Sequence, residues 1–300
     1  MPALEVLDLE FMLAPKDSEC PLQDVLSLPN MDQSRLVESD MATMTNFLSN
    51  VALSKTSIVE VDLGAANWEP TDGIQPIVDL LSALKASRSG HASSPQTNIH
   101  QVSAIHIQSP TKKGDRFATA VWLWCGLNLD LDPLKDLPTF ELHIPFDVSA
   151  AQILADAVKA TFDISRVRYL CVEDKEVLGV RGWTPFTQLP VLETIHVQAT
   201  TISPFVALLS DPGPAGEPPF PGLCNIIFED VDFDEDRTGE LLSKIGTAVA
   251  KRQKDHPLIK VSIWNCKSFG PIDAEALRKV VEVDWDGKVT LGSESNDDNE

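Results

Sequence analysis

The stretch LPVLETIHV, from Leu189 to Val197, contains the pattern that decides the fold. Its last six residues place apolar side chains at Leu192, Ile195 and Val197, with a polar residue between the last two. Apolar residues two positions apart predict a β-strand with one buried face and one open face. Pro190 suits the entry to such a strand, because proline fixes φ and cannot donate a hydrogen bond to a neighbouring strand.

The same six-residue unit recurs along the chain, with starts roughly 25 to 45 residues apart. The further copies are LEVLDL (Leu4, Leu7, Leu9), IVEVDL (Ile58, Val61, Leu63), VSAIHI (Val102, Ile105, Ile107), LPTFEL (Leu137, Phe140, Leu142), VRYLCV (Val167, Leu170, Val172), LCNIIF (Leu223, Ile226, Phe228) and LIKVSI (Leu258, Val261, Ile263). A degraded copy, MDQSRL from Met31, has Ser34 at its second apolar position. Similar proline entries, MPAL, LPNM and FPGL, precede several copies.

Helical patterns lie between the predicted strands. They cover residues 42–53, 74–86, 149–162, 237–251 and 274–281. Ser149 and Asp273 are the expected N-caps of the third and the last of these helices. Polar, glycine-rich or proline-rich stretches at 87–98, 109–116 and 211–222 predict loops.

Strands that alternate with helices predict parallel pairing through right-handed crossovers. We therefore predict an α/β leucine-rich-repeat solenoid, a curved horseshoe with one parallel sheet in sequence order on the concave face and helices on the convex face. The repeat domain would cover residues 1–290, and residues 291–300 would form a disordered acidic tail. A doubly wound sheet is the alternative, but it favours continuous apolar strands rather than alternating ones.

The charge balance is strongly acidic. The chain has 45 Asp and Glu against 24 Lys and Arg, a formal net charge of −21. This charge opposes binding to nucleic acid and to anionic membrane surfaces, so we expect a protein partner of basic character. Five cysteines without close spacing, an acidic N-terminal stretch and no long apolar run predict a reduced cytoplasmic or nuclear protein.

Sequence motifs of catalysis are absent from the chain. It contains no phosphate-binding glycine loop, no GxSxG elbow, no HExxH and no cysteine pair at zinc-ligand spacing. We therefore predict a protein that is not an enzyme and has no cofactor. An enzyme built on a solenoid scaffold is the remote alternative.

Two sets of residues resemble metal ligands without completing a site. His106 and His143 are expected on neighbouring strands, where two imidazoles alone make an incomplete site, so we predict exposed side chains and no metal. The stretch from Asp230 to Glu240 resembles a calcium loop, but its sixth and twelfth positions lack the required glycine and carboxylate. We interpret it as the acidic start of a helix near Arg237.

An aromatic cluster surrounds the sequence AVWLWCGL. Trp122, Trp124 and Phe117, with Ala120 and Leu123, predict a buried helix or strand. An exposed aromatic patch for partner binding is the alternative.

The last repeat carries a family resemblance. In LIKVSIWNCKSFGPIDAEALRKVVEVDWDG, Leu258, Val261, Ile263 and Cys266 look like a cysteine-containing LxxLxLxxC repeat, and the ending from Val283 to Gly287 is similar too. Together with the MPALEVLDL and LPVLETIHV entries, this stretch resembles the leucine-rich-repeat portion of F-box proteins abundant in mushroom-forming fungi.

The resemblance implies a role in recruiting substrates to a ubiquitin ligase. Family members usually begin with an F-box, a helical module that docks on the ligase adaptor, whereas this sequence begins within the repeats. We therefore expect no adaptor binding without an F-box. The alternatives are a truncated gene model, or a repeat scaffold or fragment unconnected to ubiquitination.

The open face of the predicted sheet is the expected binding surface. Leu7 and Leu9 point into the core, so Asp8 between them must point outward, and the same alternation applies in the other repeats. The residues expected on this face are Asp8, Glu60, Asp62, His106, Glu141, Tyr169, Glu173, His196, Gln198, Glu229 and Trp264. A solvated face without a partner is the alternative.

Overall fold

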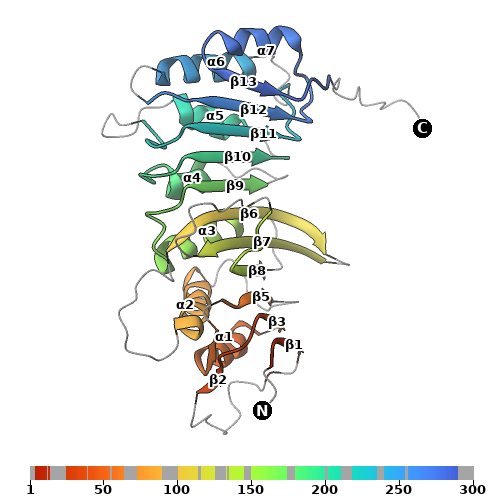
Figure 1. The fold of residues 1–300 in the computed structure, drawn as a ribbon, viewed down its shortest axis with the longest axis vertical. Coiled ribbons are helices and arrows are strands. Elements are labelled where there is room, and N and C mark those ends of the chain that lie inside the picture. The colour runs from red at the N-terminus through yellow and green to blue at the C-terminus, as the bar shows by residue number, and fades with distance from the viewer. Residues whose placement is uncertain are drawn as a thin grey trace, which may run out of the picture. The chain divides into compact units, whose positions relative to one another are not determined.

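The computed structural model describes residues 4–11, 13, 25–38, 40–54, 56–63, 73–89, 101–113, 116–125, 133, 135–144, 150–173, 180–199, 202–210, 218–234, 240–253 and 256–289. The chain divides into two compact units, Met1–Tyr169 and Leu170–Glu300. Both units are mixed α/β, and their strands are mostly parallel (Figure 1).

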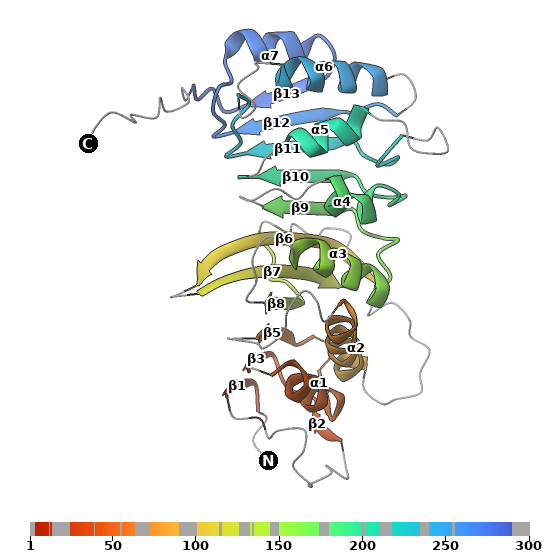
Figure 2. The ribbon, with the colours of Figure 1, turned by 180° about the vertical axis from the view of Figure 1, so that it is seen from behind.

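The first unit is built on a sheet with the strand order β1-β3-β5-β8-β7-β6. Its strands are β1 (Val6–Glu10), β3 (Gln33–Val37), β5 (Ile58–Asp62), β6 (Val102–Lys113), β7 (Arg116–Cys125) and β8 (Phe140–Ile144), and a small parallel sheet joins β2 (Leu26–Leu28) to β4 (Val51–Leu53). The helices α1 (Met41–Ser49), α2 (Gln75–Ser89) and α3 (Ala150–Thr161) cover one face of the main sheet (Figure 2). The opposite face is called the open face below.

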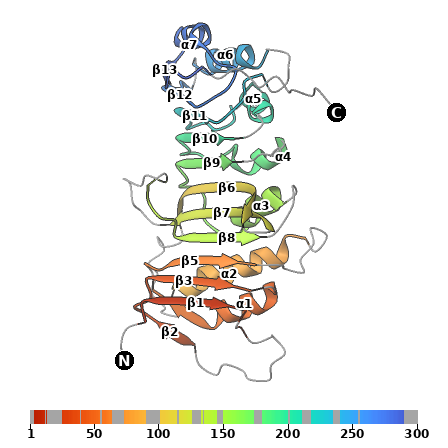
Figure 3. The same cartoon turned by 90° about the vertical axis from the view of Figure 1, so that its right-hand side faces the viewer.

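The second unit has its strands in sequence order, β9-β10-β11-β12-β13. They are β9 (Tyr169–Glu173, in this unit from Leu170 onward), β10 (Thr194–Gln198), β11 (Asn225–Glu229), β12 (Lys260–Trp264) and β13 (Glu282–Trp285), and β10 to β13 pair in parallel. The helical segments α4 (Val180–Trp183), η3 (Thr184–Phe186), α5 (Ser203–Ser210), α6 (Leu241–Arg252) and α7 (Pro271–Arg278) connect them, and α4 to α7 lie on one face (Figure 3).

The prediction of a single parallel sheet in sequence order is therefore wrong for the first unit. There β7 is antiparallel to both β6 and β8, and the order β8-β7-β6 is reversed. The expected polar loop at 109–116 lies largely inside β6 and β7, which form a hairpin. The expected alternation of strand and helix fails here because the strand pattern continues past the short turn, and antiparallel strands need only a short connection.

The alternation of buried and open side chains is confirmed in most repeats. Ser34 occupies the buried position expected for it in the degraded copy. The IVEVDL copy is displaced by two residues, because Val59 and Val61, and not Ile58, pair with the buried residues of β3. Leu4 and Leu137 are exposed although the repeat pattern predicts them inside.

Helix ends differ from the predictions by a few residues. The first helix ends at Ser49, and the residues expected to continue it form β4. The helix expected from Arg237 begins at Leu241. Asp273 lies within the first turn of α7 instead of capping it, and its carboxylate accepts the backbone N–H of Gly270 at 2.9 Å. Ser149, the tail from 291 and most of the loops at 87–98 and 211–222 lie outside the described residues.

An aromatic spine forms the core of the second unit. Its neighbouring rings have centroids 4.9 to 6.4 Å apart, a range in which aromatic pairs contribute about 0.5–1.5 kcal/mol beyond the area that they bury. In order, its members are Trp183, Phe205, Phe228, Phe233, Phe269 and Trp285. Two strands, two helices and two connecting segments thus contribute to a core that continues from one repeat to the next.

A backbone feature recurs where strands end. The residue after a strand donates its N–H to a carbonyl at the end of the neighbouring strand, at 2.9 to 3.1 Å. The pairs are Phe11 to Val37, Glu38 to Asp62, Leu63 to His143, Ala199 to Glu229 and Asp230 to Trp264. In each unit, this bond connects the C-terminal ends of neighbouring parallel strands.

Candidate functional site

One row of side chains crosses the open face of the first unit. Its members pair directly across β1, β3, β5, β8, β7 and β6, and alternation along each strand turns them to the same side. In sheet order the row consists of Asp8, Arg35, Glu60, Glu141, Trp122 and His106. Four of these six were predicted for the binding face, and the structure brings them together; it adds Arg35 and Trp122.

Arg35 bridges two carboxylates at the β1 end of the row. Its guanidinium lies 3.3 Å from Oδ1 of Asp8 and 3.5 Å from Oε1 of Glu60. The Asp8 side chain is 60% exposed, so this ion pair is solvated and contributes about 0–1 kcal/mol. Sequence reasoning missed Arg35, although its place between Ser34 and Leu36 repeats the place of Asp8 between Leu7 and Leu9.

Two carboxylates and an imidazole meet in the middle of the row. Glu60 and Glu141 are direct neighbours on β5 and β8, and Nε2 of His143 lies 2.6 Å from Oε1 of Glu141. One ligand atom from each of these three residues lies within 4.8 Å of the others. The His143 side chain is only 8% exposed, whereas that of Glu141 is 25% exposed. Asp62 pairs with His143 in the next row of the sheet.

Trp122 separates two histidines at the other end of the row. Its ring centroid lies 4.5 Å from that of His106 and 6.1 Å from that of His143, which it meets edge-on at 88°. The expectation that these histidines occupy neighbouring strands is wrong, because β7 lies between β6 and β8. The expected exposure is also wrong for His143, which is buried.

The aromatic cluster has one tryptophan on the open face and one in the interior. Trp122 is half-buried on the open face, whereas Trp124 is buried and donates its indole N–H to the carbonyl of Asp136 at 3.0 Å. The predicted burial in a strand is thus confirmed for Trp124, with Ala120 and Leu123. The side chain of Phe117 lies outside the described residues.

The second unit holds a different histidine–glutamate pair. Nε2 of His196 lies 2.9 Å from Oε2 of Glu229 on the neighbouring strand, and the His196 side chain is fully buried. Burial lowers the pKa of His196 to about 4, so the imidazole is neutral at pH 7. Burial also raises the pKa of Glu229, and the nearby Asp230 and Glu173 raise it further. The expected exposure of His196 is therefore wrong, since Ile227 is its apolar cross-strand neighbour.

The other predicted residues of this unit lie at the C-terminal strand ends. Gln198, Glu229 and Trp264 pair across β10, β11 and β12, and the Trp264 ring meets that of His196 edge-on at 6.5 Å. Glu173 is the half-buried last residue of β9, whereas Tyr169, also half-buried, is its first residue and belongs to the first unit.

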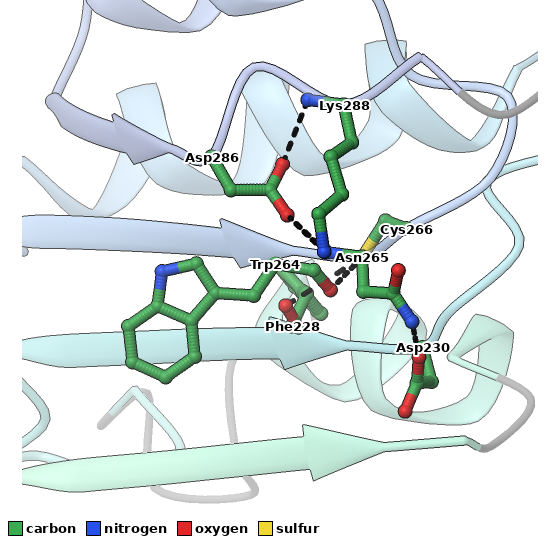
Figure 4. A network of polar contacts seen from close by, with 7 residues as sticks. All are labelled: Phe228, Asp230, Trp264, Asn265, Cys266, Asp286 and Lys288. Atoms are coloured by element: carbon green, nitrogen blue, oxygen red, sulfur yellow. Dashed lines mark hydrogen bonds and ion pairs between the residues drawn. The ribbon is translucent and has the colours of Figure 1, made fainter.

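A polar network closes the strand ends beyond Trp264 (Figure 4). Asn265 donates its side-chain amide to Asp230 and its backbone N–H to Asp286 at 2.8 Å, and Lys288 lies 3.7 Å from Asp286. The Cys266 thiol donates to the carbonyl of Trp264 at 3.3 Å, and burial raises its pKa to about 11. The bonds of Asn265 connect successive repeats, and burial keeps the Cys266 thiol protonated at pH 7.

In the acidic stretch that resembles a calcium loop, two carboxylates accept hydrogen bonds within turns. The Asp232 carboxylate accepts the hydroxyl of Ser268 at 2.8 Å and the backbone N–H of Asp234 at 3.1 Å. Asp230 accepts the amide of Asn265. Two of the three alternating carboxylates therefore stabilise the exit from β11.

Comparison of the chain with family models, with curated proteins and with solved structures gave no match. Among the described helices, none is both long and apolar enough to cross a membrane.

Proposed function

We propose that the chain is a non-enzymatic protein-binding module, a leucine-rich-repeat solenoid whose open sheet face recognises a basic protein segment. The observation that carries the proposal is the first-unit row, in which Asp8, Glu60 and Glu141 face outward and Arg35 is the one guanidinium among six side chains. An acidic face of this kind steers a basic partner and raises its association rate.

Repeat geometry supports the solenoid part of the proposal. The recurring N–H donation at strand ends and the aromatic spine both connect each repeat to its neighbour, as stacked units require. The resemblance to substrate-recruiting repeats of F-box proteins makes ubiquitin-ligase substrate recognition the biological setting that we propose.

The test starts from partners captured on the full chain from host lysate and identified by mass spectrometry. For each captured partner, association kinetics are measured at low and high salt with the wild type and with a D8S/D62S/E141S variant. We expect slower association with the variant and a weaker dependence on salt, because exposed charges act mainly on the association rate. Equal and salt-insensitive rates in both proteins would contradict the proposal.

A matched control removes carboxylates from a strand of the second unit. Glu282 and Asp284 of β13 are solvent-facing residues of the second unit outside the predicted binding set. An E282S/D284S variant removes two carboxylates, against three in the D8S/D62S/E141S variant. Association of this control at the wild-type rate would assign the effect to the carboxylates on the open face of the first unit instead of total charge.

A further inference from the structure

We propose that Glu60, Glu141 and His143 form a binding site for a divalent transition metal ion, and for Zn²⁺ in particular. One ligand atom of each residue lies within 4.8 Å of the other two. Two carboxylate oxygens and one imidazole nitrogen are a donor set that Zn²⁺ accepts with three protein ligands and an open fourth position. Metal binding at this site is distinct from the proposed partner binding and is measured without a partner.

The imidazole is what separates this cluster from an ordinary acidic patch. The His143 side chain is 8% exposed, and its Nε2 points at Glu141 from 2.6 Å. Imidazole favours Zn²⁺ and its neighbours in the first transition series, whereas Ca²⁺ and Mg²⁺ prefer sites made of oxygen alone. The rings of Trp122 and His143 are perpendicular, with centroids 6.1 Å apart, and this contact limits the positions open to the imidazole.

Charge gives a second, independent reason for a cation at this place. Glu60 and Glu141 are direct cross-strand neighbours, and like charges in that position destabilise a sheet. Arg35 reaches Glu60 from the far side, at 3.5 Å from Oε1. A divalent ion between Glu60 and Glu141 would compensate the repulsion between them and would use the His143 nitrogen as its third ligand.

The distances allow coordination with small side-chain movements. A tetrahedral ion with bonds of about 2.0–2.2 Å holds its ligand atoms about 3.4 Å apart. The three atoms need shifts of the order of 1 Å to reach that spacing, which the broad terminal torsion of a glutamate permits. His143 and Glu141 are two residues apart on β8, so one strand supplies two of the ligands.

The test titrates the reduced full chain with ZnCl₂ by isothermal calorimetry. We expect one saturable site in the wild type. Loss of a partner around a metal ligand costs about 10–100-fold in affinity, so loss of a ligand in E60Q, E141Q or H143Q should cost at least as much. The matched controls are D8N, which removes a carboxylate of the same row, and H106Q, which removes the histidine on the other side of Trp122; both should retain wild-type affinity.

Two further measurements separate this site from other donors of the chain. Co²⁺ bound by oxygen and nitrogen should show no sulfur-to-metal charge-transfer band, whereas binding at a cysteine would show one. Circular dichroism of each variant checks that it is folded. The proposal is overturned by no saturable binding to the wild type, by equal affinity in folded H143Q and E141Q, or by a sulfur band that accompanies binding.

Discussion

Each unit of the molecule places a histidine beside a glutamate, and the two pairs behave differently. His143 and Glu141 lie on one strand of the first unit, whereas His196 and Glu229 lie on neighbouring strands of the second. Both imidazoles meet a tryptophan edge-on, Trp122 at 6.1 Å and Trp264 at 6.5 Å. The residue types and ring contacts are thus nearly the same in the two units.

The cross-strand neighbours make the difference. His143 pairs with Asp62 on β5, and Glu60 adds a further carboxylate beside Glu141. His196 pairs with Ile227, and its burial lowers its pKa to about 4. The same imidazole is therefore a candidate ligand in a polar neighbourhood and a neutral core residue in an apolar one. What a histidine can do on a sheet depends on strands that are distant in the sequence.

The largest effect is expected in the aromatic spine of the second unit. Phe228 is buried between the rings of Phe205 and Phe233, so F228A should lower the free energy of unfolding by about 3–5 kcal/mol. Urea denaturation followed by circular dichroism measures the change. I259A, at an exposed position just before β12, is the control and should change stability by less than about 0.5 kcal/mol. A loss below about 1 kcal/mol in F228A would show that the spine is loosely packed.

The next effect is the pH dependence of stability that His196 produces. Its folded pKa of about 4 lies below the unfolded value of about 6.5, so the unfolded state binds a proton that the folded state does not. Stability should therefore fall by up to about 3 kcal/mol as pH decreases from 6.5 to 4, partly offset by the raised pKa of Glu229.

Unfolding curves of wild type and H196Q across this pH range measure the difference. H196Q should flatten the dependence, and an H196Q curve as steep as that of the wild type would contradict the assignment to this residue.

A smaller effect is expected where two repeats of the second unit touch. A Cβ added at Gly222 would lie 2.8 Å from the carbonyl oxygen of Pro190, a backbone atom that cannot rotate away. G222A should cost about 1–3 kcal/mol, as other overpacked sites do. G246A is the control, because its Cβ would only contact the Leu277 side chain at 3.8 Å and alanine favours the helix by up to about 1 kcal/mol. Thermal unfolding of both variants should show opposite shifts, and a stable G222A would indicate that the two repeats can separate without cost.

The smallest effect on stability is expected on the open face of the first unit. Asp8 forms one exposed ion pair with Arg35, so D8S should change the free energy of unfolding by about 0–1 kcal/mol. Chemical denaturation at low and high salt measures this change, which should shrink as salt rises. A loss above about 2 kcal/mol would mean that the charged side chains of the row form a network that stabilises the folded state.

Much of the fold follows from local pattern, and the candidate site does not. The alternation at Ile195 and Val197, or at Ile226 and Phe228, identifies strands and their buried faces because side-chain direction in a strand has a period of two. The same argument places Asp8, Glu60 and Glu141 on the open face, and the row confirms their common side. The displacement of IVEVDL by two residues leaves this side unchanged, since an even shift preserves the face.

Only the tertiary structure decides which strands are neighbours. Within the first unit, the β6–β7 hairpin pairs with β8 on the side away from β5 and brings Trp122 between His106 and His143. The pairing of β5 with β8 places Glu60 against Glu141, whereas the pairing of β10 with β11 places His196 against Ile227. Local sequence determines the direction of a side chain, but its neighbours come from pairing between distant segments, and charge, burial and metal-ligand geometry depend on those neighbours.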